Sequence, residues 1–360
     1  MNKYNIALEI LNVLNNDGFE AYIVGGFPRD YYLGVINDDI DICTNALYED
    51  LKRLFCNLNY SKYGSYIVEY KDYCFDITTY RKDVSSFKNR FPVSVKFINN
   101  LFGDLKRRDF TINTLCIDCN GNFVDIMNSR IDINHRIIKL IGSGKKIYDD
   151  SLRILRAIRF ATVLDFSIDN RLSRAIVKYK NNLNSLSFDR KKIELDKIFM
   201  SHNCLYGLNL IRSYGLEELL HINLSDVVIV DDLCGMWAQV IVDDKYNFRK
   251  NEKYKIMKIR ELLWKIFDIY DLYLYGPDIM GAVSKIKGDG LNISKIYSSL
   301  PIKDRDDIDV DFFDICSIIN VNDQMIGMIY SDIEKKIIYK KLSNKKEDIL
   351  DYIFTKYKGK

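Results

Sequence analysis

The stretch VGGFPRDYYLGVINDDIDI, residues 24–42, contains the features that decide the fold. Paired glycines, Gly25 and Gly26, follow a short apolar segment, and two carboxylates, Asp39 and Asp41, stand two residues apart in the next one. In a β-strand the side chains at positions i and i+2 point to the same side, so Asp39 and Asp41 are expected to lie together. Two carboxylates that close repel each other unless a cation lies between them.

The chemistry of this stretch predicts a site for a metal ion and a polyphosphate. Mg²⁺ is a hard cation that takes one or two carboxylates together with phosphate oxygens, so Asp39 and Asp41 are candidate magnesium ligands. Gly25 and Gly26 leave backbone N–H groups uncovered, while the helix start that follows and Arg29 add positive potential for a triphosphate. An acidic pair alone is also common on ordinary exposed strands. The combination of glycines, arginine and acids therefore carries the prediction.

The bulk composition is typical of a helix-rich globular protein. The chain has 360 residues, of which 48% are hydrophobic and 29% charged, and this length predicts two or more domains. The formal net charge is only +3, so a basic surface for nucleic acid has to be local. The most apolar stretch, residues 224–244, is broken by aspartates, which excludes a membrane span. No secretory signal is recognisable, and a cytoplasmic location is expected.

The order of apolar patterns predicts an α/β or α+β head followed by an all-helical remainder. Helical periodicity and short apolar runs predict, in order, a helix at 4–16, strands at 20–26 and 38–43, a helix at 47–55, two strands within 65–80 and two within 110–126. Beyond Ile141 the segments follow helical periodicity, and no strand is predicted before the end of the chain.

Three further motifs stand in a recognisable order after the first. They are LKRRDFTINTL at 105–115, DDSLRILRAIRFA at 149–161 and SFDRKKIELDKIF at 187–199. The first motif is similar to that of the nucleotidyltransferase superfamily that includes DNA polymerase beta. All four together resemble the class II tRNA nucleotidyltransferase (CCA-adding enzyme) and bacterial poly(A) polymerase family. The resemblance is strong over residues 20–200 and fainter to the C-terminus.

The resemblance implies a polymerase-beta-like nucleotidyltransferase head followed by a helical neck, body and tail. The expected boundaries are a head with the catalytic sheet at 1–142, a neck with nucleotide-base recognition at 143–200, a body at 201–270 and a tRNA-binding tail at 271–360. It also implies Mg²⁺ as the cofactor, CTP and ATP as nucleotides, and the 3′ acceptor end of tRNA as the RNA partner. Lys and Arg along the helical parts are expected to contact RNA phosphates. No membrane partner is expected, and the oligomeric state is left open.

The resemblance further implies roles for individual residues. The metal ligands are Asp39 and Asp41, with Asp76 as a candidate third acid. The triphosphate contacts are Gly25, Gly26 and Arg29, and the ribose contacts are Arg108, Asp109 and Asn113. The base-recognition residues are Asp150, Arg153, Arg156 and Arg159, and the neck residues are Arg190 and Glu194.

The residue types at positions 150 and 153 suggest how a base could be chosen without a template. Asp150 and Arg153 are three residues apart on a predicted helix, and so are expected on one face. A carboxylate accepts from an exocyclic amine, and a guanidinium donates two parallel hydrogen bonds to ring acceptors. Cytosine and adenine carry the amine where uracil and guanine carry a carbonyl. A helix-start acid in an ordinary salt bridge is the alternative, and this chain has Asp149 where the family usually has Glu.

These features predict template-independent addition of C, C and A to the tRNA 3′ end, with release of pyrophosphate. The polar, basic segment 80–97 resembles the flexible loop that the family uses when switching from C to A addition, which favours the complete CCA product; an ordinary surface loop is the alternative. A poly(A) polymerase or a CC- or A-restricted enzyme would share the same motifs. An inactive RNA-binding relative is a further alternative, against which the intact acids and arginines argue.

Overall fold

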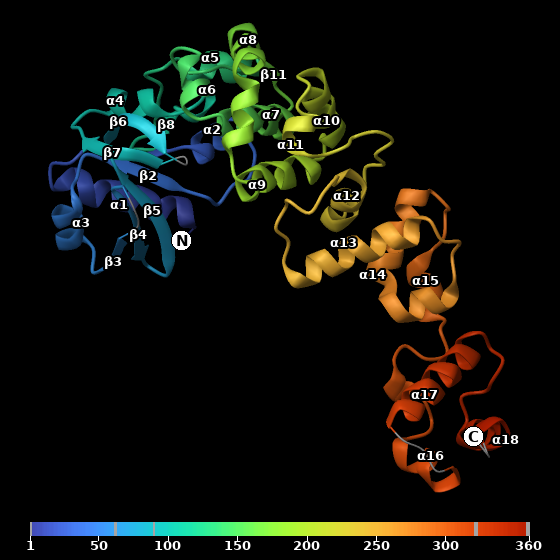
Figure 1. Ribbon diagram of the computed structural model, residues 1–360. Helices are drawn as coiled ribbons and strands as arrows, with labels where there is room; N and C mark the ends of the chain where they lie inside the picture. The colour runs from blue at the N-terminus through green and yellow to red at the C-terminus, as the bar shows by residue number, and fades with distance from the viewer. Residues whose placement is uncertain (1, 61–62, 89–90, 320–322, 358–360) are drawn as a thin grey trace. The chain divides into compact units, whose positions relative to one another are not determined.

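Figure 1 shows the computed structural model, which describes residues 2–60, 63–88, 91–319 and 323–357. The chain divides into two compact units, residues 1–222 and residues 223–360. The predicted division into head, neck, body and tail is finer than this one and stays a prediction.

The first unit is built on a mixed seven-stranded sheet, which confirms the predicted combination of helices and strands. In spatial order the strands are β3 (Asn57–Tyr60), β4 (Ser65–Tyr70), β5 (Tyr73–Thr79), β2 (Asp41–Thr44), β1 (Ala21–Val24), β8 (Cys116–Ile117) and β9 (Phe123–Val124). Neighbouring strands are antiparallel except β2 and β5, which are parallel. The helices of this part are α1 (Lys3–Asn16), α2 (Gly26–Tyr32), α3 (Tyr48–Leu54) and α4 (Leu101–Arg107).

The start of β2 follows from the alternation of acids and isoleucines. Ile40 and Ile42 are buried in the core beneath the sheet, whereas Asp39 is exposed and Asp41 is partly buried. The predicted strand at 38–43 is observed at 41–44, so Asp39 lies just before it. Burial of the two isoleucines turns both acids to the opposite side, as a two-residue repeat requires.

Strands occur in three places where the sequence analysis expected none. One is β3; another is the hairpin of β6 (Arg81–Lys88) and β7 (Phe91–Phe97), where a loop was expected and where residues 89 and 90 lie outside the described residues. The third is the short parallel pair of β10 (Ile137–Ile138) and β11 (Ser167–Ile168). Among the described residues, the expectation of no strand after Ile141 is therefore wrong at β11. A two-residue strand is too short to produce a sequence period.

The rest of the first unit is helical. Its helices are α5 (Ser129–Asn134), α6 (Lys145–Asp149), α7 (Leu152–Leu164), α8 (Asn170–Tyr179), α9 (Phe188–Phe199), α10 (Cys204–Ser213) and α11 (Glu217–Leu220). Helix α7 packs against α9 and α10 and buries most of its side chains, among them Leu155 and Ile158.

The boundary between α6 and α7 corrects one prediction. Asp150 has an extended backbone with φ −140° and ψ 96°, and α7 begins only at Leu152. Asp150 and Arg153 therefore do not share a helix as expected. The Asp150 carboxylate instead accepts a hydrogen bond from the N–H of Leu152 at 3.3 Å, because the free N–H groups of a helix start favour an aspartate just before it.

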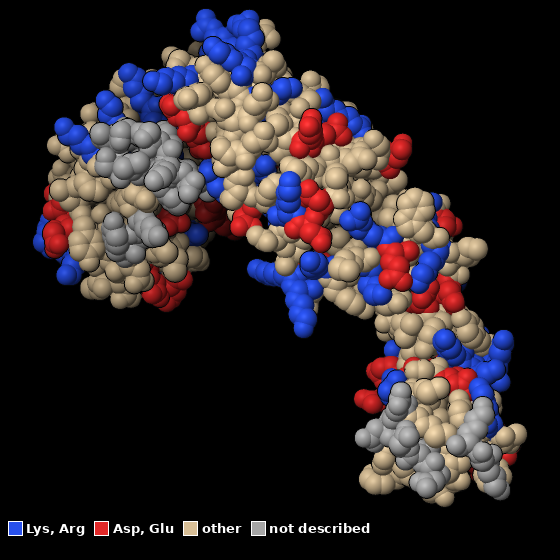
Figure 2. All heavy atoms as spheres, in the orientation of Figure 1, with Lys and Arg blue, Asp and Glu red and all other residues tan. Residues whose placement is uncertain are grey.

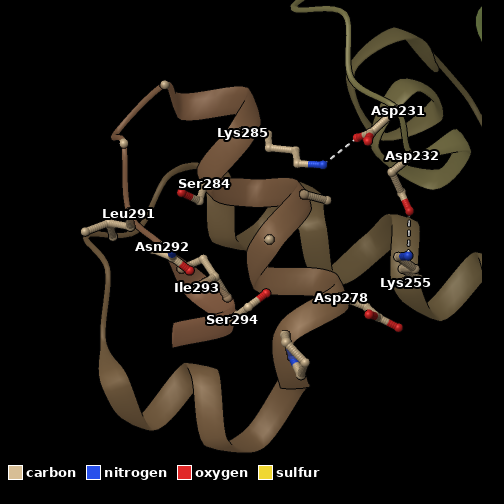
Figure 3. Close-up of a pocket in the computed structure, with 15 residues that line it drawn as sticks. Asp231, Asp232, Lys255, Asp278, Ser284, Lys285, Leu291, Asn292, Ile293 and Ser294 are labelled. Atoms are coloured by element: carbon tan, nitrogen blue, oxygen red, sulfur yellow. Dashed lines mark hydrogen bonds and ion pairs between the residues drawn. The ribbon is translucent and has the colours of Figure 1, made fainter. Parts of the chain in front are cut away.

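The second unit contains helices and no β-strand among its described residues. They are α12 (Leu233–Val240), α13 (Lys250–Leu263), α14 (Ile269–Lys287), α15 (Ile293–Ser298), α16 (Phe312–Ile318), α17 (Asp323–Ile338) and α18 (Lys346–Tyr357). Figure 3 shows how the segment before α12 is tied to two other helices: Lys285 of α14 lies 2.5 Å from Asp231, and Lys255 of α13 lies 2.7 Å from Asp232. Among the described helices, none is long and apolar enough to cross a membrane.

Candidate active site

A cavity of about 590 Å³ in the first unit brings together most of the predicted site residues. The predicted residues on its wall are Gly25, Gly26, Arg29, Asp39, Asp41, Arg108, Asp109, Asn113, Asp150, Arg153, Arg156 and Arg159. The wall also contains residues that the sequence analysis did not assign: Asp30, Asn37, Arg81, Arg107, Leu152 and Phe160. Asp76, Arg190 and Glu194 lie outside the wall. A larger cavity of about 920 Å³ lies in the second unit, but the lysines there are already paired with Asp231 and Asp232 (Figure 3).

The acidic edge of the cavity has the electrostatics of a cation site. Burial and the neighbouring charge of Asp39 raise the pKa of Asp41 to about 6, against the opposing effect of Arg108, and Asp76 adds to the increase. Asp76 faces Asp41 across the parallel pair of β2 and β5. Within the described residues, no group of three or more His, Cys, Asp or Glu side chains could hold a metal by itself. A carboxylate pair fits Mg²⁺, which takes its remaining ligands from phosphate and water.

Asn37 fixes the loop that carries the acids. Its side-chain oxygen accepts from the N–H of Asp39 at 2.8 Å, and its amide donates to Asp30 Oδ2 at 2.7 Å. Asp30 belongs to α2, so the loop and the helix after the glycines are held together. The position of Asp39 therefore depends on a side chain that carries no charge.

Position 25 requires a glycine, because the Asp41 side chain lies directly against it. Its φ is +93°, a conformation that side chains disfavour, and a Cβ atom built on it would lie 2.9 Å from Asp41 Oδ2. Gly26 has no such constraint, because its nearest neighbour would be at 3.5 Å. The first glycine thus allows the carboxylate to lie against the backbone turn.

Arg29 is held inside a network rather than free in the cavity. It is buried, its Nε donates to Asp30 Oδ1 at 2.8 Å, and its Nη1 donates to Asn113 Oδ1 at 2.6 Å. Asn113 in turn donates from Nδ2 to Asp109 Oδ1 at 3.1 Å. The predicted triphosphate and ribose residues are therefore physically connected.

Asp109 is the centre of this network. Arg156 donates from Nε to its Oδ2 at 2.7 Å, and the N–H of Phe110 donates to its Oδ1 at 2.8 Å. Burial alone would raise the pKa of Asp109, but the guanidinium groups of Arg156 and Arg153 outweigh burial and hold that pKa well below its usual range. Both carboxylate oxygens thus already have protein donors. Each oxygen can still accept a further hydrogen bond from a ligand, because a carboxylate oxygen accepts more than one.

A fully buried carboxylate, Asp104, holds a second group of arginines. Its oxygens lie 2.8 Å from Arg107 Nε and 3.3 Å from Arg108 Nη2, and one of them accepts from the N–H of Arg81 at 3.2 Å. Burial would raise the pKa of Asp104, but Arg107 and Arg108 lower it below the ordinary value. Asp104 therefore fixes the wall arginines and the first residue of the β6–β7 hairpin together.

Arg153 has unused hydrogen-bonding capacity where the wall meets α7. It is 8% exposed, and its Nη2 donates to the carbonyl oxygen of Arg107 at 3.4 Å, whereas Nε and Nη1 are buried and have no protein partner. Asp150 Oδ1 accepts two hydrogen bonds, one from the N–H of Leu152 and one from Arg190 Nη2 at 3.1 Å. Within the described part of the chain no donor bonds its Oδ2. Buried donors without a partner cost about 1–3 kcal/mol each, so their presence on a cavity wall points to a ligand.

The neck helix α9 and an aromatic ring support the remaining arginines. Arg159 Nε lies 2.6 Å from Glu194 Oε2. The ring of Phe160 lies within cation–π distance of three guanidinium groups, at 4.0 Å from Arg159, 5.3 Å from Arg29 and 5.4 Å from Arg156. Both neck residues that were singled out, Arg190 and Glu194, therefore pair with residues of the cavity wall.

The unassigned residues differ in how visible they are in the sequence. Asp104 precedes Arg107 and Arg108 by three and four residues, which is the spacing of ion pairs on a helix, so this pairing could have been predicted. Phe160 has the apolar character of any core residue, and its contact with arginines depends on folding. Asn37 and Arg81 carry no local pattern that points to the site.

The mixed sheet, the acids beside a glycine turn and the arginine-lined cavity define a nucleotidyltransferase of the polymerase-beta-like class. Residues 21–139 match the model of the poly(A) polymerase head domain, and residues 165–224 match a probable RNA- and SrmB-binding site of polymerase A. The CCA-adding enzyme of Streptococcus uberis is 30% identical over 388 aligned residues, which cover 98% of this chain and 96% of that protein. The chain therefore belongs to the family of class II CCA-adding enzymes and bacterial poly(A) polymerases.

Solved structures agree over nearly the whole chain. The Bacillus stearothermophilus CCA-adding enzyme in complex with CTP is 25% identical, with a TM-score of 0.85 over 98% of this chain and 97% of that one. The Thermotoga maritima CCA-adding enzyme complexed with tRNA has the same fold, with 19% identity and a TM-score of 0.66 over 98% and 94% of the two chains. The predicted fold class, family and enzyme class are thus confirmed.

Replacement of Gly25 by alanine is expected to lower nucleotidyl transfer by tenfold or more, that is by about 1.4 kcal/mol. The new Cβ would displace the Asp41 carboxylate, and a side chain in this glycine-specific backbone conformation would add about 1–3 kcal/mol of strain. Gly34→Ala is the matched control, because Gly34 also has a positive φ, of +73°, but a Cβ atom there would meet nothing within 4 Å; this variant should retain most activity. Steady-state incorporation rates, with thermal unfolding as a check on folding, measure both; equal activity of the two variants would contradict the role of Gly25.

Replacement of Asp104 by asparagine is expected to lower the free energy of unfolding by about 3 kcal/mol at pH 7, because it leaves buried arginines without their counter-charge. The pKa of Asp104 is lower in the folded than in the unfolded protein. The difference in unfolding free energy between wild type and variant is therefore fully present above about pH 4, the ordinary carboxyl pKa. It shrinks as the pH falls from there through the pKa of Asp104 in the folded protein. Urea unfolding at pH 7 and pH 3.5 measures the difference. Asp72→Asn, at an exposed turn, is the control, and a pH-independent difference would contradict this account.

Proposed function

We propose that this chain adds C, C and A to the 3′ end of tRNA from CTP and ATP, without a template and with release of pyrophosphate. One observation carries the proposal: a single cavity contains both the Asp39/Asp41 pair and a buried Arg153 with two donors, Nε and Nη1, that lack a protein partner. Support comes from relatives whose structures contain CTP or tRNA. The chemistry of transfer and the means of choosing a base would thus meet in one place.

Asp39 and Asp41 are the residues that would hold Mg²⁺. Burial, and then the neighbouring charge of Asp39, raises the pKa of Asp41, and this supports the role because a cation beside the pair would favour the charged carboxylate. When bound, Mg²⁺ would activate the RNA 3′-hydroxyl and neutralise charge on the triphosphate. Asp76 remains a candidate third acid on the basis of its position opposite Asp41.

The triphosphate would lie along the glycine turn and the arginine wall. Gly25 and Gly26 leave the backbone accessible, and Arg107 and Arg108 are held in place by Asp104 rather than ordered by the ligand. Cations that are fixed beforehand need little reorganisation when charge develops on the leaving pyrophosphate. Arg29 would act from inside its network with Asp30 and Asn113. Asp109 and Asn113 remain the candidates for the ribose.

The base would be read by Arg153 and Asp150. The free Nε and Nη1 donors of Arg153 suit the ring nitrogen and carbonyl acceptors of cytosine, or a ring nitrogen of adenine. The free Oδ2 of Asp150 suits the exocyclic amine of either base, while its Oδ1 is held by Arg190. Uracil and guanine would place a carbonyl oxygen against the carboxylate. A buried unpaired polar contact of that kind costs about 1–3 kcal/mol.

The product range is tested with three transcripts of one tRNA, which end before the first C, before the second C and before the terminal A. Each is incubated with Mg²⁺ and a single nucleotide. The proposal predicts that, with CTP, two C residues are added to the first transcript and one to the second, and that, with ATP, a single A is added to the third. Long A-tails would identify a poly(A) polymerase, a stop at CC a restricted enzyme, and RNA binding without incorporation an inactive relative.

Asp41→Ala is expected to abolish incorporation, with a loss of at least about 1,000-fold, because one of two metal ligands is removed. Its affinity for tRNA, measured by filter binding, should change by less than about twofold. The matched control is Asp38→Ala, which removes an exposed neighbouring carboxylate. Comparable activity of the Asp38 and Asp41 variants would contradict the alternating pair as the metal site.

Arg153→Ala is expected to weaken base choice. The ratio of kcat/KM for CTP over UTP should fall by about tenfold or more. The reason is that the variant loses the guanidinium donors that match the ring nitrogen and carbonyl acceptors of cytosine. The measurement is single-nucleotide incorporation on the transcript that ends before the first C. An unchanged ratio, even with reduced activity, would refute the assignment of Arg153 to the base.

A further inference from the structure

Helix α13 in the second unit has an exposed face with cations and aromatic rings. The large exposed side chains on this face are Tyr254, Met257 and Trp264, which are 52%, 59% and 92% exposed. Three exposed cations lie on the same face: Lys250, Lys253 and Arg260. Trp264 directly follows the last helical residue and continues the helical backbone.

The spacing of these residues makes them one continuous surface. Lys250, Tyr254, Met257 and Trp264 are separated by intervals of four, three and seven residues. At 100° per residue all the exposed residues of this face fall within a band about 120° wide. The band is about 21 Å long, at 1.5 Å per residue. It can therefore contact an extended partner at several points.

The charge on this face is positive. Its exposed acid, Glu261, is paired on both sides, 2.9 Å from Lys258 Nζ and 2.9 Å from Lys265 Nζ. The charges of Lys250, Lys253 and Arg260 are therefore not cancelled by it. In Figure 2 Lys and Arg side chains project from the part of the surface where Figure 1 places α13.

The combination of lysines with exposed rings favours nucleic acid over protein as the partner. Protein interfaces are depleted of lysine, whereas RNA phosphates attract lysine and arginine. Unpaired RNA bases stack on aromatic side chains, and an indole that is 92% exposed has a free face for such stacking. A solvated helix face would account for the lysines but not for three large exposed apolar side chains in register with them.

We propose that this face of α13 binds RNA, with Lys250, Lys253 and Arg260 on phosphates and Trp264 stacked on an unpaired base. The proposal rests on the proposed function, since it names a second contact surface for the same RNA substrate. These residues lie on α13 or directly after it, and none of them lines the cavity of the first unit.

Intrinsic fluorescence tests the stacking directly, because the chain has only two tryptophans. Trp237 is 1% exposed in the core of the second unit, so changes in emission on RNA binding report mainly on Trp264. The probe is a tRNA transcript that lacks its terminal CCA. Titration is expected to quench the emission of the wild-type protein and to leave that of Trp264→Phe nearly unchanged.

Affinity measurements test the contribution of each group. By filter binding, Trp264→Ala is expected to raise the Kd for the transcript about tenfold, and Trp264→Phe to restore most of the loss. Lys253→Ala and Arg260→Ala should each reduce the slope of log K against log salt by about one. Lys285→Ala is the matched control, because it removes a lysine of the same unit that is already paired with Asp231. Circular dichroism verifies that each variant is folded.

Two results would overturn the proposal. One is an unchanged Kd and unquenched emission with a folded Trp264→Ala protein. The other comes from sedimentation velocity: the wild type self-associates, Trp264→Ala does not, and the RNA affinity of the two proteins is the same. The partner of this face would then be a second copy of the chain. Incorporation by the wild type is measured in the same buffer. If the wild type incorporates CTP while Trp264→Ala binds the transcript with normal affinity, only the proposed RNA contact of α13 fails. If the transcript quenches the emission of the wild type but no nucleotide is incorporated, only the proposed function fails.

Discussion

The placement of two carboxylates beside a glycine turn is the constraint on which the candidate site depends. Burial of Ile40 and Ile42 turns Asp39 and Asp41 to the same side, and the sheet places Asp76 opposite Asp41. Burial and the neighbouring charge of Asp39 together raise the pKa of the Asp41 carboxyl group to about 6. The fold therefore maintains an unfavourable charge arrangement, which is characteristic of a functional site rather than of a stabilising one.

The arginines of the cavity show the complementary arrangement. Asp104 balances one group of guanidinium groups, Asp109 another, and Glu194 a third. Each acid is buried, so the arginines are oriented before any ligand arrives. Arg153 differs from the others because two of its donors have no protein partner. An array of fixed cations can receive a polyanion at a low entropic cost, since few side chains have to be ordered on binding.

The sequence was sufficient to predict a mixed head, a helical remainder and most of the residues that line the cavity, because those residues fall in motifs with fixed local spacing. It was insufficient where long-range contacts decide the geometry. Asp150 and Arg153 were expected on one helix, but the preference of aspartate for a helix start separates them, and Arg190, 40 residues away, holds the carboxylate. The contacts of Phe160 and the pairing of β11 were likewise invisible to periodicity. Strands β6 and β7 pair, with a shift of register between Val84 and Phe87, where polar composition suggested a loop.

The pairing of β10 with β11 has a mechanical consequence for α7. These two short strands lie before α6 and after α7 in the chain, so their hydrogen bonds close a loop around both helices. Asp150 and Arg190 secure the opposite end of α7. A helix held at both ends gives the cavity one wall of fixed position, so any change in the shape of the cavity has to come from the segments around it or from a bound ligand.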